Sequence, residues 1–212
     1  MSARASTRPP APGKRALDVL LSGAGLVASL PIWAIIALAI KLEDGGPVFY
    51  SQTRVGQGGR IFRVFKFRSM IPDAEARVGA LQASERDPRI TRAGRLLRAS
   101  ALDELPQLWS IFRGDMSFVG PRALRPGEIE VNGTGALVAL EDVPGFAERC
   151  GVPPGLTGVA QIHASRDLPR RQKFRYDRVY IRRQSLWLDV QLIMLSFWIT
   201  FRGTWEARGR KF

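Results

Sequence analysis

The longest apolar stretch of the chain covers residues 19–40 and follows the basic pair Lys14 and Arg15. At a rise of about 1.5 Å per residue, about 22 helical residues reach about 33 Å, which is the thickness of the hydrocarbon core of a bilayer. This pattern predicts a membrane helix over residues 14–42. Residues 1–13 are rich in Ser, Ala, Pro and Arg and have no periodicity, which predicts a disordered tail.

Three arrangements of this helix compete. A signal peptide would explain the basic start and the sequence Ala37-Leu38-Ala39, but its apolar region is usually shorter. A straight spanning helix fits the length, but basic residues flank both ends and the positive-inside rule disfavours export of the basic domain that follows. The third arrangement has a kink at Pro31, where a backbone donor is missing and Ser29 can supply a local partner. We expect this re-entrant helix, with a mildly bent spanning helix as the alternative.

Strand-like alternation begins after Gly45-Gly46-Pro47. Residues 48–56 and 60–68 are typical of strands, and the turn residues Gln57-Gly58-Gly59 separate them. The pattern predicts a β-hairpin. Both faces of its second strand mix apolar and basic side chains, which suits a hairpin beside an anionic surface or ligand.

Two shorter helices are expected before the middle of the chain. Residues 72–81 have acidic residues early and Pro72 at the start, as helices often do. Residues 92–99 belong to an arginine-rich segment, residues 85–98, and Thr91 can cap the helix that they form.

The C-terminal part of the chain joins a basic segment to an apolar one. Residues 170–183 are rich in arginine, and residues 186–201 are strongly apolar but short for a membrane span. This combination favours a helix that lies in the membrane interface. An ordinary buried C-terminal helix is the alternative.

The segment between these regions gives weaker patterns. Residues 128–147 are either helical or looped, since glycines interrupt them. Residues 153–158 read as a turn and residues 159–162 as a short strand. Together the elements predict an α/β fold that is mostly helical and carries one small β-hairpin.

Charge narrows the set of partners. The 212-residue chain has 32 Lys and Arg against 19 Asp and Glu, and its formal net charge is +13 at pH 7. Anionic lipid, nucleic acid and phosphorylated ligands are the partners that such a surplus favours. The single cysteine, Cys150, excludes an internal disulfide framework. The single histidine, His163, disfavours zinc, so any metal would be a hard cation bound by oxygen atoms.

The adjacent carboxylates Asp103 and Glu104 are the centre of the candidate chemistry. They lie between the arginine-rich segment, residues 85–98, and the turn Gly120-Pro121-Arg122. A short apolar helical pattern follows them, and the amides and dipole at a helix N-terminus favour anions. Ser100 and Asp103 also have the spacing of a capping box, which gives Asp103 a purely structural alternative role. We interpret the carboxylate pair as the reactive centre of a membrane-seated phosphate-transfer enzyme.

A series of short motifs resembles those of the bacterial sugar transferases, also called monotopic phosphoglycosyl transferases or undecaprenyl-phosphate sugar phosphotransferases. One such motif would be weak evidence, but here they follow the family's order from residue 14 to about residue 200. The chain length leaves no room for the extra N-terminal membrane domain of larger relatives, so we expect the minimal catalytic form. The matching motifs are Lys14-Arg15-Ala16-Leu17-Asp18, Ser29-Leu30-Pro31, Gly46-Pro47-Val48-Phe49 with Gln52 to Gly56, Lys66-Phe67-Arg68-Ser69-Met70, Leu102-Asp103-Glu104-Leu105-Pro106-Gln107, Gly114-Asp115-Met116-Ser117, Gly120-Pro121-Arg122, Pro154-Gly155-Leu156-Thr157-Gly158 and Ser185-Leu186-Trp187-Leu188-Asp189.

This resemblance implies a reaction and roles for individual residues. A UDP-sugar would give its sugar-1-phosphate to undecaprenyl phosphate, with release of UMP. Asp103 would be the nucleophile that forms a covalent aspartyl-phosphosugar intermediate, and Glu104 would bind Mg²⁺. The residues implied to contact substrate or phosphate are Lys66, Arg68, Arg122 and Asp177.

The resemblance also implies a cellular setting. The helix over residues 14–42 would re-enter at the break Ser29 to Pro31, in the bacterial inner membrane. Residues 43–212 would form a catalytic domain on the cytoplasmic face, against anionic lipid and ending in an interfacial helix. The reaction would be the first membrane step in the synthesis of a surface glycan, such as exopolysaccharide, O-antigen, capsule or glycoprotein. Nucleic acid is not an expected partner of this enzyme, and a homodimer is one option for its oligomeric state.

Two other functions are compatible with parts of the sequence. A basic membrane-surface adaptor that binds anionic lipid or nucleic acid would explain the net charge, and its binding would be sensitive to salt. It would not explain the Asp103–Glu104 pair, since acids weaken anion binding unless a metal is present. A phosphatidyl transferase would normally have several spanning segments, whereas one is evident here.

Overall fold

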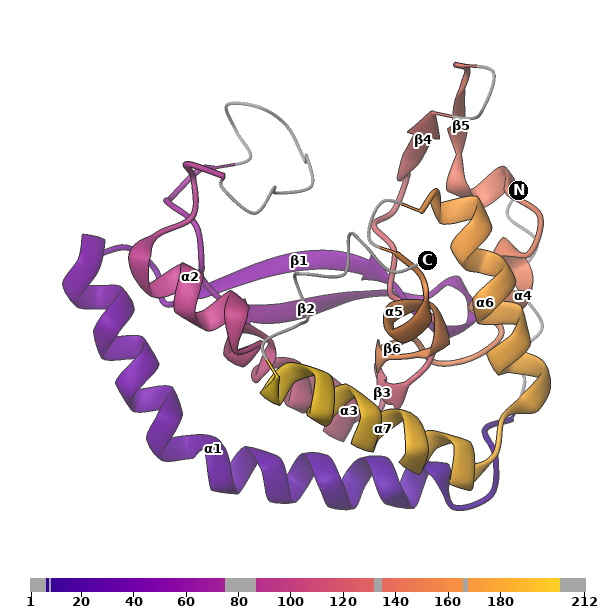
Figure 1. Ribbon diagram of the computed structural model, residues 1–212, viewed down its shortest axis with the longest axis horizontal. Coiled ribbons are helices and arrows are strands. Elements are labelled where there is room, and N and C mark those ends of the chain that lie inside the picture. Colours follow the sequence, from indigo (N-terminus) through magenta and orange to yellow (C-terminus); the bar gives the residue numbers. More distant parts are fainter. Residues whose placement is uncertain (1–6, 8, 75–86, 132–134, 166–167, 203–212) are drawn as a thin grey trace.

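The computed structural model describes residues 7, 9–74, 87–131, 135–165 and 168–202, and Figure 1 labels its elements. It combines helices with two-stranded sheets, which confirms the predicted mixed class. The helices are α1 (Lys14–Asp44), α2 (Arg92–Ala99), α3 (Gln107–Arg113), α4 (Phe146–Cys150), α5 (Val159–His163), α6 (Arg170–Arg183) and α7 (Leu186–Phe201). The strands are β1 (Phe49–Val55), β2 (Ile61–Phe67), β3 (Ser117–Val119), β4 (Ile129–Val131), β5 (Leu137–Ala139) and β6 (Gly155–Thr157).

Two predictions lie largely outside the described residues. The predicted tail over residues 1–13 includes residues 1–6 and 8, and most of the helix predicted over residues 72–81 falls in the range 75–86. The described start of that helix, residues 72–74, forms a turn. Both therefore stay predictions.

Strands β1 and β2 form the predicted hairpin, antiparallel from Phe49 opposite Phe67 to Val55 opposite Ile61. A 3-10 turn at Gln57–Gly59 connects them. Successive residues of a strand point to opposite faces, and in β2 one face is mostly buried while the other is exposed until Phe67.

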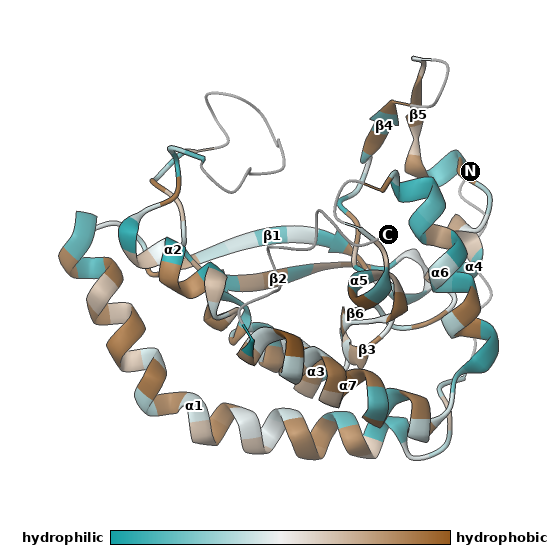
Figure 2. Cartoon of the chain, viewed as in Figure 1, coloured by the Kyte–Doolittle hydropathy of each residue, from teal (hydrophilic) through white to brown (hydrophobic). Residues whose placement is uncertain are grey.

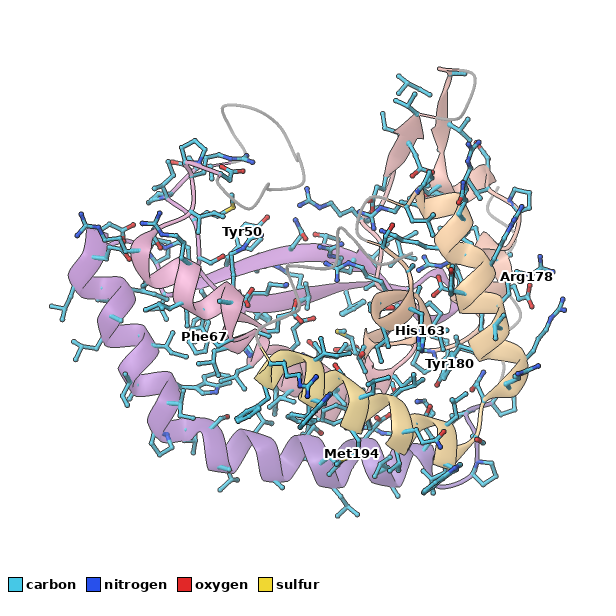
Figure 3. All side chains as sticks on the ribbon, in the orientation of Figure 1. Tyr50, Phe67, His163, Arg178, Tyr180 and Met194 are labelled. Atoms are coloured by element: carbon cyan, nitrogen blue, oxygen red, sulfur yellow. The ribbon has the colours of Figure 1, made fainter. Side chains whose placement is uncertain are left out.

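The two faces of β2 have different neighbours. Phe62 and Val64 are buried in the main core with residues of β3, α3, α6 and α7. Lys66 belongs to the same face, beyond the apolar part of the core. Phe67, labelled in Figure 3, belongs to the other face and packs against α1, where its ring lies 5.3 Å from that of Trp33. Lys66 is thus partly buried at the end of the face that carries Phe62 and Val64.

Strands β3 and β6 pair in parallel and carry the turn Gly120-Pro121-Arg122 directly after β3. A Cβ atom added at Gly155 would lie 2.0 Å from the backbone nitrogen of Gly120, so the two backbones touch where only glycine fits. The prediction of a plain turn over residues 153–158 was wrong, since β6 lies inside it. The strand predicted over residues 159–162 was also wrong, because these residues form α5.

The segment over residues 128–147 is also more regular than predicted. Its residues form the antiparallel pair β4–β5, followed by a 3-10 turn at Leu140–Asp142 and the start of α4. In Figure 1 this hairpin projects at the end of the molecule away from the bend in α1. Gly135, one of the glycines that interrupt the helical pattern, lies just before β5.

Helix α2 confirms its prediction in both bounds and cap. The Thr91 hydroxyl accepts a hydrogen bond from the Gly94 backbone nitrogen at 2.9 Å. The Glu43 carboxylate, from the end of α1, accepts hydrogen bonds from the backbone nitrogens of Arg92 and Ala93 at 2.6 and 3.0 Å. An anion at a helix N-terminus is stabilising there, so this contact fixes the end of α1 against α2.

A buried polar network fixes the beginning of α1. Lys14 Nζ lies 2.7 Å from Asp189 Oδ2 of α7 and donates to the Val119 carbonyl at 2.9 Å. The Tyr180 hydroxyl, from α6, donates to the other oxygen of Asp189 at 2.9 Å. One turn further along α1, Asp18 accepts hydrogen bonds from the backbone nitrogen of Phe118 and the hydroxyl of the residue before it. Three of the recognised motifs thus meet in one structural network.

Helix α1 (31 residues) contains Pro31 and bends along its course in Figure 1. It is the one helix among the described residues that is long and apolar enough to cross a membrane. Near Pro31, the Ser29 hydroxyl donates to the Leu26 carbonyl at 3.2 Å and accepts from the Trp33 indole at 3.0 Å. Ser29 therefore has local partners, but the carbonyl that it contacts is not the one that Pro31 leaves without a donor, which is that of Val27, so the predicted contact is not the one formed.

A broad apolar surface covers the side of the molecule formed by α1, α3 and α7, where Figure 2 shows hydrophobic residues along α1 and α7. Leu20, Val27 and Leu42 of α1 are 71–77% exposed. In α7, Ile193 is buried while Met194 and Phe197 are exposed. Helix α7 is therefore neither fully buried nor fully exposed, and its outer side continues the surface of α1.

Candidate functional site

The local backbone presents the carboxylate pair at a tight turn between α2 and α3. Ala101 has φ +56°, a left-handed conformation that is uncommon outside glycine, and the 3-10 turn Leu102–Glu104 follows it. Pro106 then occupies the position before α3, where its missing N–H costs no helical hydrogen bond. The pair is thus held on a short, strained connection between two helices.

The capping-box alternative for Asp103 was wrong. The Ser100 hydroxyl donates to the carbonyls of Leu96 and Leu97 and so belongs to the end of α2. The residue that precedes the 3-10 turn is Ala101, and no side chain caps it. A structural explanation of Asp103 as a cap therefore fails.

Lys66 brings the hairpin to the carboxylate pair. Its Nζ atom forms a close ion pair with Glu104 Oε1 and lies 3.8 Å from Asp103 Oδ2. Asp103 is 9% exposed, whereas Glu104 and Lys66 are partly exposed. The lysine is thus hydrogen-bonded to Glu104, and its contact with Asp103 is one of charge alone.

The surroundings of the two carboxyl groups shift their pKa values in opposite directions. Burial raises the pKa of Asp103 to about 6; Lys66 opposes this increase and Glu104 adds to it. Burial acts on Glu104 in the same direction, but the charges of Lys66 and Arg122 outweigh it and lower the pKa of Glu104. At neutral pH both groups are mainly ionised, and Asp103 is the carboxylate whose charge is less well stabilised.

Arg122 is exposed at the end of the β3 turn and acts electrostatically on Glu104. A hydrogen bond fixes its backbone, since Arg149 Nη2 donates to the Arg122 carbonyl at 2.6 Å. Asp177, which the resemblance implied as a substrate contact, is buried and lies 3.2 Å from Arg149 Nε. In this structure Asp177 therefore supports the turn that carries Arg122.

Arg68 is held away from the carboxylate pair. It is buried, and its guanidinium forms a two-fold ion pair with Asp44 at the end of α1 and donates to the Pro47 carbonyl at 2.6 Å. The structure thus brings Lys66 to both carboxylates and Arg122 within electrostatic range of Glu104, and it places Arg68 and Asp177 in supporting ion pairs. Ser29 and Pro31 belong to the apolar helix.

Two further residues near the site, Gln107 and Arg54, lie in matching motifs but were assigned no role from the sequence. The Gln107 side chain hydrogen-bonds to Glu104. The two residues are three positions apart, a spacing at which side chains of a helical turn meet, so the sequence could have suggested this contact. Arg54 of β1 donates to the Ala123 carbonyl at 3.0 Å, next to Arg122. No local pattern links residues so far apart in the chain, so Arg54 needed the structure.

The donor set of the pair fits a magnesium ion shared with a substrate. No group of three or more Asp, Glu, His or Cys side chains that could hold a metal occurs among the described residues. Mg²⁺ commonly uses one or two carboxylates and completes its shell with waters and substrate phosphates. Glu104, partly exposed and beside Asp103, offers hard oxygen ligands of this kind.

The described cavity of about 670 Å³ lies elsewhere. Residues of β4, β5 and α6 line it, among them Glu130, Val138 and Arg175. None of the predicted site residues lines it, so this cavity is separate from the Asp103–Glu104 pair.

Comparison with known proteins gives one family. The model of the family described as bacterial sugar transferase matches residues 10–203. The chain is 44% identical over 190 residues to an undecaprenyl-phosphate glucose phosphotransferase of Komagataeibacter xylinus, covering 86% of this chain and 35% of that protein. It is 40% identical over 184 residues to a UDP-glucose:undecaprenyl-phosphate glucose-1-phosphate transferase of Xanthomonas campestris pv. campestris, covering 84% and 37%.

A third relative is closer in length. The chain is 34% identical over 194 residues to the exopolysaccharide production protein ExoY of Rhizobium meliloti, covering 85% of this chain and 81% of ExoY. The chain thus spans little more than a third of the first two relatives and most of the third. In each of the three, the match covers more than four fifths of this chain.

Proposed function

The chain belongs to the bacterial sugar transferase family, and we propose that it is a phosphoglycosyl transferase. It moves a sugar-1-phosphate from a UDP-sugar to undecaprenyl phosphate and releases UMP. The names of two relatives supply these substrate classes. The observation that carries the proposal is the buried Asp103 carboxylate, whose raised pKa marks it as poorly stabilised beside an ion-paired Glu104. The name of ExoY supports exopolysaccharide as one pathway for the product.

In the first step, a carboxylate oxygen of Asp103 attacks the phosphorus atom that carries the sugar. A bond forms between that oxygen and phosphorus, and the bond from phosphorus to the bridging diphosphate oxygen breaks. UMP leaves with the electron pair of the broken bond. A buried carboxylate that is not hydrogen-bonded to Lys66 suits this step, because strong hydrogen bonds would weaken it as a nucleophile.

In the second step, a phosphate oxygen of undecaprenyl phosphate attacks the same phosphorus. The bond between Asp103 and phosphorus breaks, and its electron pair returns the carboxylate to its starting state. The product is a sugar joined to the lipid by a diphosphate. Splitting the transfer in this way lets one site serve two large substrates in turn.

Basic residues near the pair would neutralise the phosphates. Lys66 and Arg122 bring positive charge to the carboxylates, and without it two anions would repel each other during attack. Glu104 is the residue that would hold Mg²⁺ together with diphosphate oxygens, where a bound ion supplies further neutralisation.

The attachment of α1 supports a re-entrant helix on the cytoplasmic face of the bacterial inner membrane. The beginning of α1 is tied to the domain through Lys14 and Asp189, and its end is tied through Glu43 to α2 and through Asp44 to Arg68. A straight spanning helix would separate its two ends by the full bilayer, whereas here one domain holds both. The apolar outer side of α7 would lie in the same membrane leaflet.

The proposal is tested by incubating the purified full chain in detergent with Mg²⁺, undecaprenyl phosphate and a panel of UDP-sugars, and measuring UMP. We expect UMP from at least one donor, and loss of this release in Asp103→Asn. The matched control is Asp142→Asn, at an exposed carboxylate, and it should release UMP like the wild type. Folded wild-type protein that releases UMP from no donor but binds anionic vesicles would favour the adaptor function instead.

A further inference from the structure

Arg54 lies beside the turn that carries Arg122, since its guanidinium contacts the carbonyl of the next residue, Ala123. It comes from β1, and its guanidinium is half-buried. Nη1 donates to the Ala123 carbonyl at 3.0 Å, and Nη2 donates to the Gln52 side chain. The contact with Ala123 holds the Arg54 guanidinium next to the backbone that follows Arg122.

The charges that face Arg54 are mostly of its own sign. They are Arg122, Arg125 and Arg170, with Glu128 as the one carboxylate among them. Glu128 is already engaged, since Arg170 Nη2 lies 2.8 Å from its Oε1 and the Arg125 backbone nitrogen donates to its Oε2 at 3.1 Å. Burial first, and then the neighbouring arginines, lower the pKa of Arg54 to about 10.

Neither Arg54 nor Arg122 has a carboxylate within 4.0 Å in the part of the chain that the structure describes. A half-buried guanidinium that is repelled by its neighbours and has no counter-ion is unfavourable on its own. An anion that binds there would remove both costs. A guanidinium fork is well matched to the oxygens of a phosphate.

Arg122 connects this positive cluster to the reactive pair. Its charge acts on both Glu104 and Arg54. A diphosphate that places one phosphate at Asp103 would therefore extend its second phosphate toward Arg122 and Arg54.

We propose that Arg54 binds, together with Arg122, the phosphate group of the departing nucleoside monophosphate. This inference rests on the proposed transferase function and adds a residue to its site. Negative charge grows on the departing phosphate as its bond to the transferred phosphorus breaks, so a preorganised guanidinium stabilises the transition state more than the bound donor. Arg54 also holds the product UMP until it dissociates.

The test compares nucleotide binding by the full-length protein in detergent, in the Asp103→Asn background so that no turnover occurs. The probes are UMP, inorganic pyrophosphate and uridine, which lacks phosphate. Arg54→Gln keeps an amide donor without the charge, and Arg54→Lys keeps the charge without the fork. The control is Arg63→Gln, at an exposed arginine of the same hairpin that contacts Ser51 Oγ.

We expect Arg54→Gln to weaken binding of UMP and pyrophosphate by roughly 10- to 100-fold, with Arg54→Lys intermediate and Arg63→Gln unchanged. Uridine binding should stay the same in all variants. Equal weakening of uridine and UMP would show a structural role and overturn the proposal, as would unchanged UMP binding in folded Arg54→Gln. Because binding is read directly, these outcomes do not depend on whether any UDP-sugar is turned over.

In the active enzyme, Arg54→Gln should lower kcat for UMP release by roughly 10²-fold and raise KM less, since the contact strengthens in the transition state. An increase in KM with kcat unchanged would contradict this role. If the Asp103→Asn protein binds UMP through Arg54 but the wild type releases none from any donor, the transferase proposal fails and the phosphate site stands.

Discussion

The molecule contains two assemblies in which a lysine lies beside carboxylates. They differ in how completely the charged groups are paired and hydrogen-bonded. In the Lys14 assembly, the ammonium lies 2.7 Å from Asp189, and the second oxygen of Asp189 accepts a hydrogen bond from Tyr180. In the Lys66 assembly, the ammonium pairs closely with Glu104 and remains 3.8 Å from Asp103. All the carboxylates involved belong to motifs of the recognised series.

This difference separates scaffold from chemistry. A buried ion pair with its remaining hydrogen bonds satisfied holds elements together, and the Lys14 assembly joins α1, β3, α6 and α7. A buried carboxylate that lacks such partners costs stability and keeps its reactivity. Recognised motifs alone do not distinguish these roles, whereas the hydrogen-bond partners of each carboxylate do.

The largest effect should come from the reactive carboxylate. Asp103→Asn removes the anionic nucleophile, so we expect UMP release to fall by at least about 10³-fold while the protein remains folded. UMP release is measured by a coupled assay, and folding by circular dichroism and thermal unfolding. Residual activity within about tenfold of the wild type would exclude Asp103 as the nucleophile.

The scaffold carboxylate should affect stability instead. Asp189→Ala leaves Lys14 buried and unpaired, so we expect the free energy of unfolding to fall by roughly 3–5 kcal/mol. Thermal unfolding in detergent measures this, with Asp142→Ala as the exposed control. The fraction that stays folded at low temperature should keep most of its activity per molecule. A variant as stable as the wild type would remove the distinction between the two assemblies.

The dependence of the unfolding free energy on pH should also show that burial disfavours the ionised Asp103 carboxylate. Folding raises its pKa from 3.8 to about 6, so the folded state holds the proton more tightly than the unfolded state does. The stability that this group contributes is complete below pH 3.8 and is lost as the pH rises through about 6. We therefore expect Asp103→Asn to be more stable than the wild type by roughly 1–3 kcal/mol at pH 8.

The gain in Asp103→Asn should shrink as the pH falls toward 4, where the wild-type carboxyl is protonated like a neutral amide. Denaturation in buffers between pH 4 and pH 8 measures the difference. A pH-independent gain would mean that ionisation of Asp103 is not its source.

The smallest effect concerns Lys66. The wild-type kcat/KM should fall as the pH drops through about 6, because the nucleophile must be ionised. Lys66→Met removes a charge that lowers the pKa of Asp103, so its acid limb should move upward by about one pH unit. Lys66→Arg should restore most of the wild-type profile, and Lys41→Met, at an exposed lysine, should leave it unchanged. An acid limb that does not move in Lys66→Met would contradict the assigned coupling.

The parts of the fold that depend on local sequence were predictable. The Thr91 cap and the bounds of α2, the β1–β2 hairpin around its glycine turn, and the extent of α7 all follow from patterns within a few residues. Strand β6 and helix α5 were not predicted, because a three-residue parallel strand is defined by its partner β3, far away in the chain. Helix α5 has 5 residues, too few for helix propensity to predict it.

The same limit applies to the site. The sequence pointed to Asp103 and Glu104 as neighbours, but their contact with Lys66 depends on how the hairpin packs. Arg68 and Asp177 have the residue types of substrate contacts, and their partners Asp44 and Arg149 become visible only in the structure. The local pattern even suggested a capping box at Asp103, since spacing alone cannot show that the Ser100 hydroxyl turns back toward α2.

The most direct test of the account is whether the sugar phosphate becomes attached to Asp103. The wild-type protein is mixed with Mg²⁺ and the active UDP-sugar without undecaprenyl phosphate, quenched in acid, and analysed by intact and peptide mass spectrometry. We predict a mass increase of one sugar phosphate on the peptide that contains Asp103, formed with one equivalent of UMP and discharged when undecaprenyl phosphate is added. An adduct on another residue, or UMP release with no adduct under conditions that preserve acyl phosphates, would contradict the assignment of Asp103 as the nucleophile.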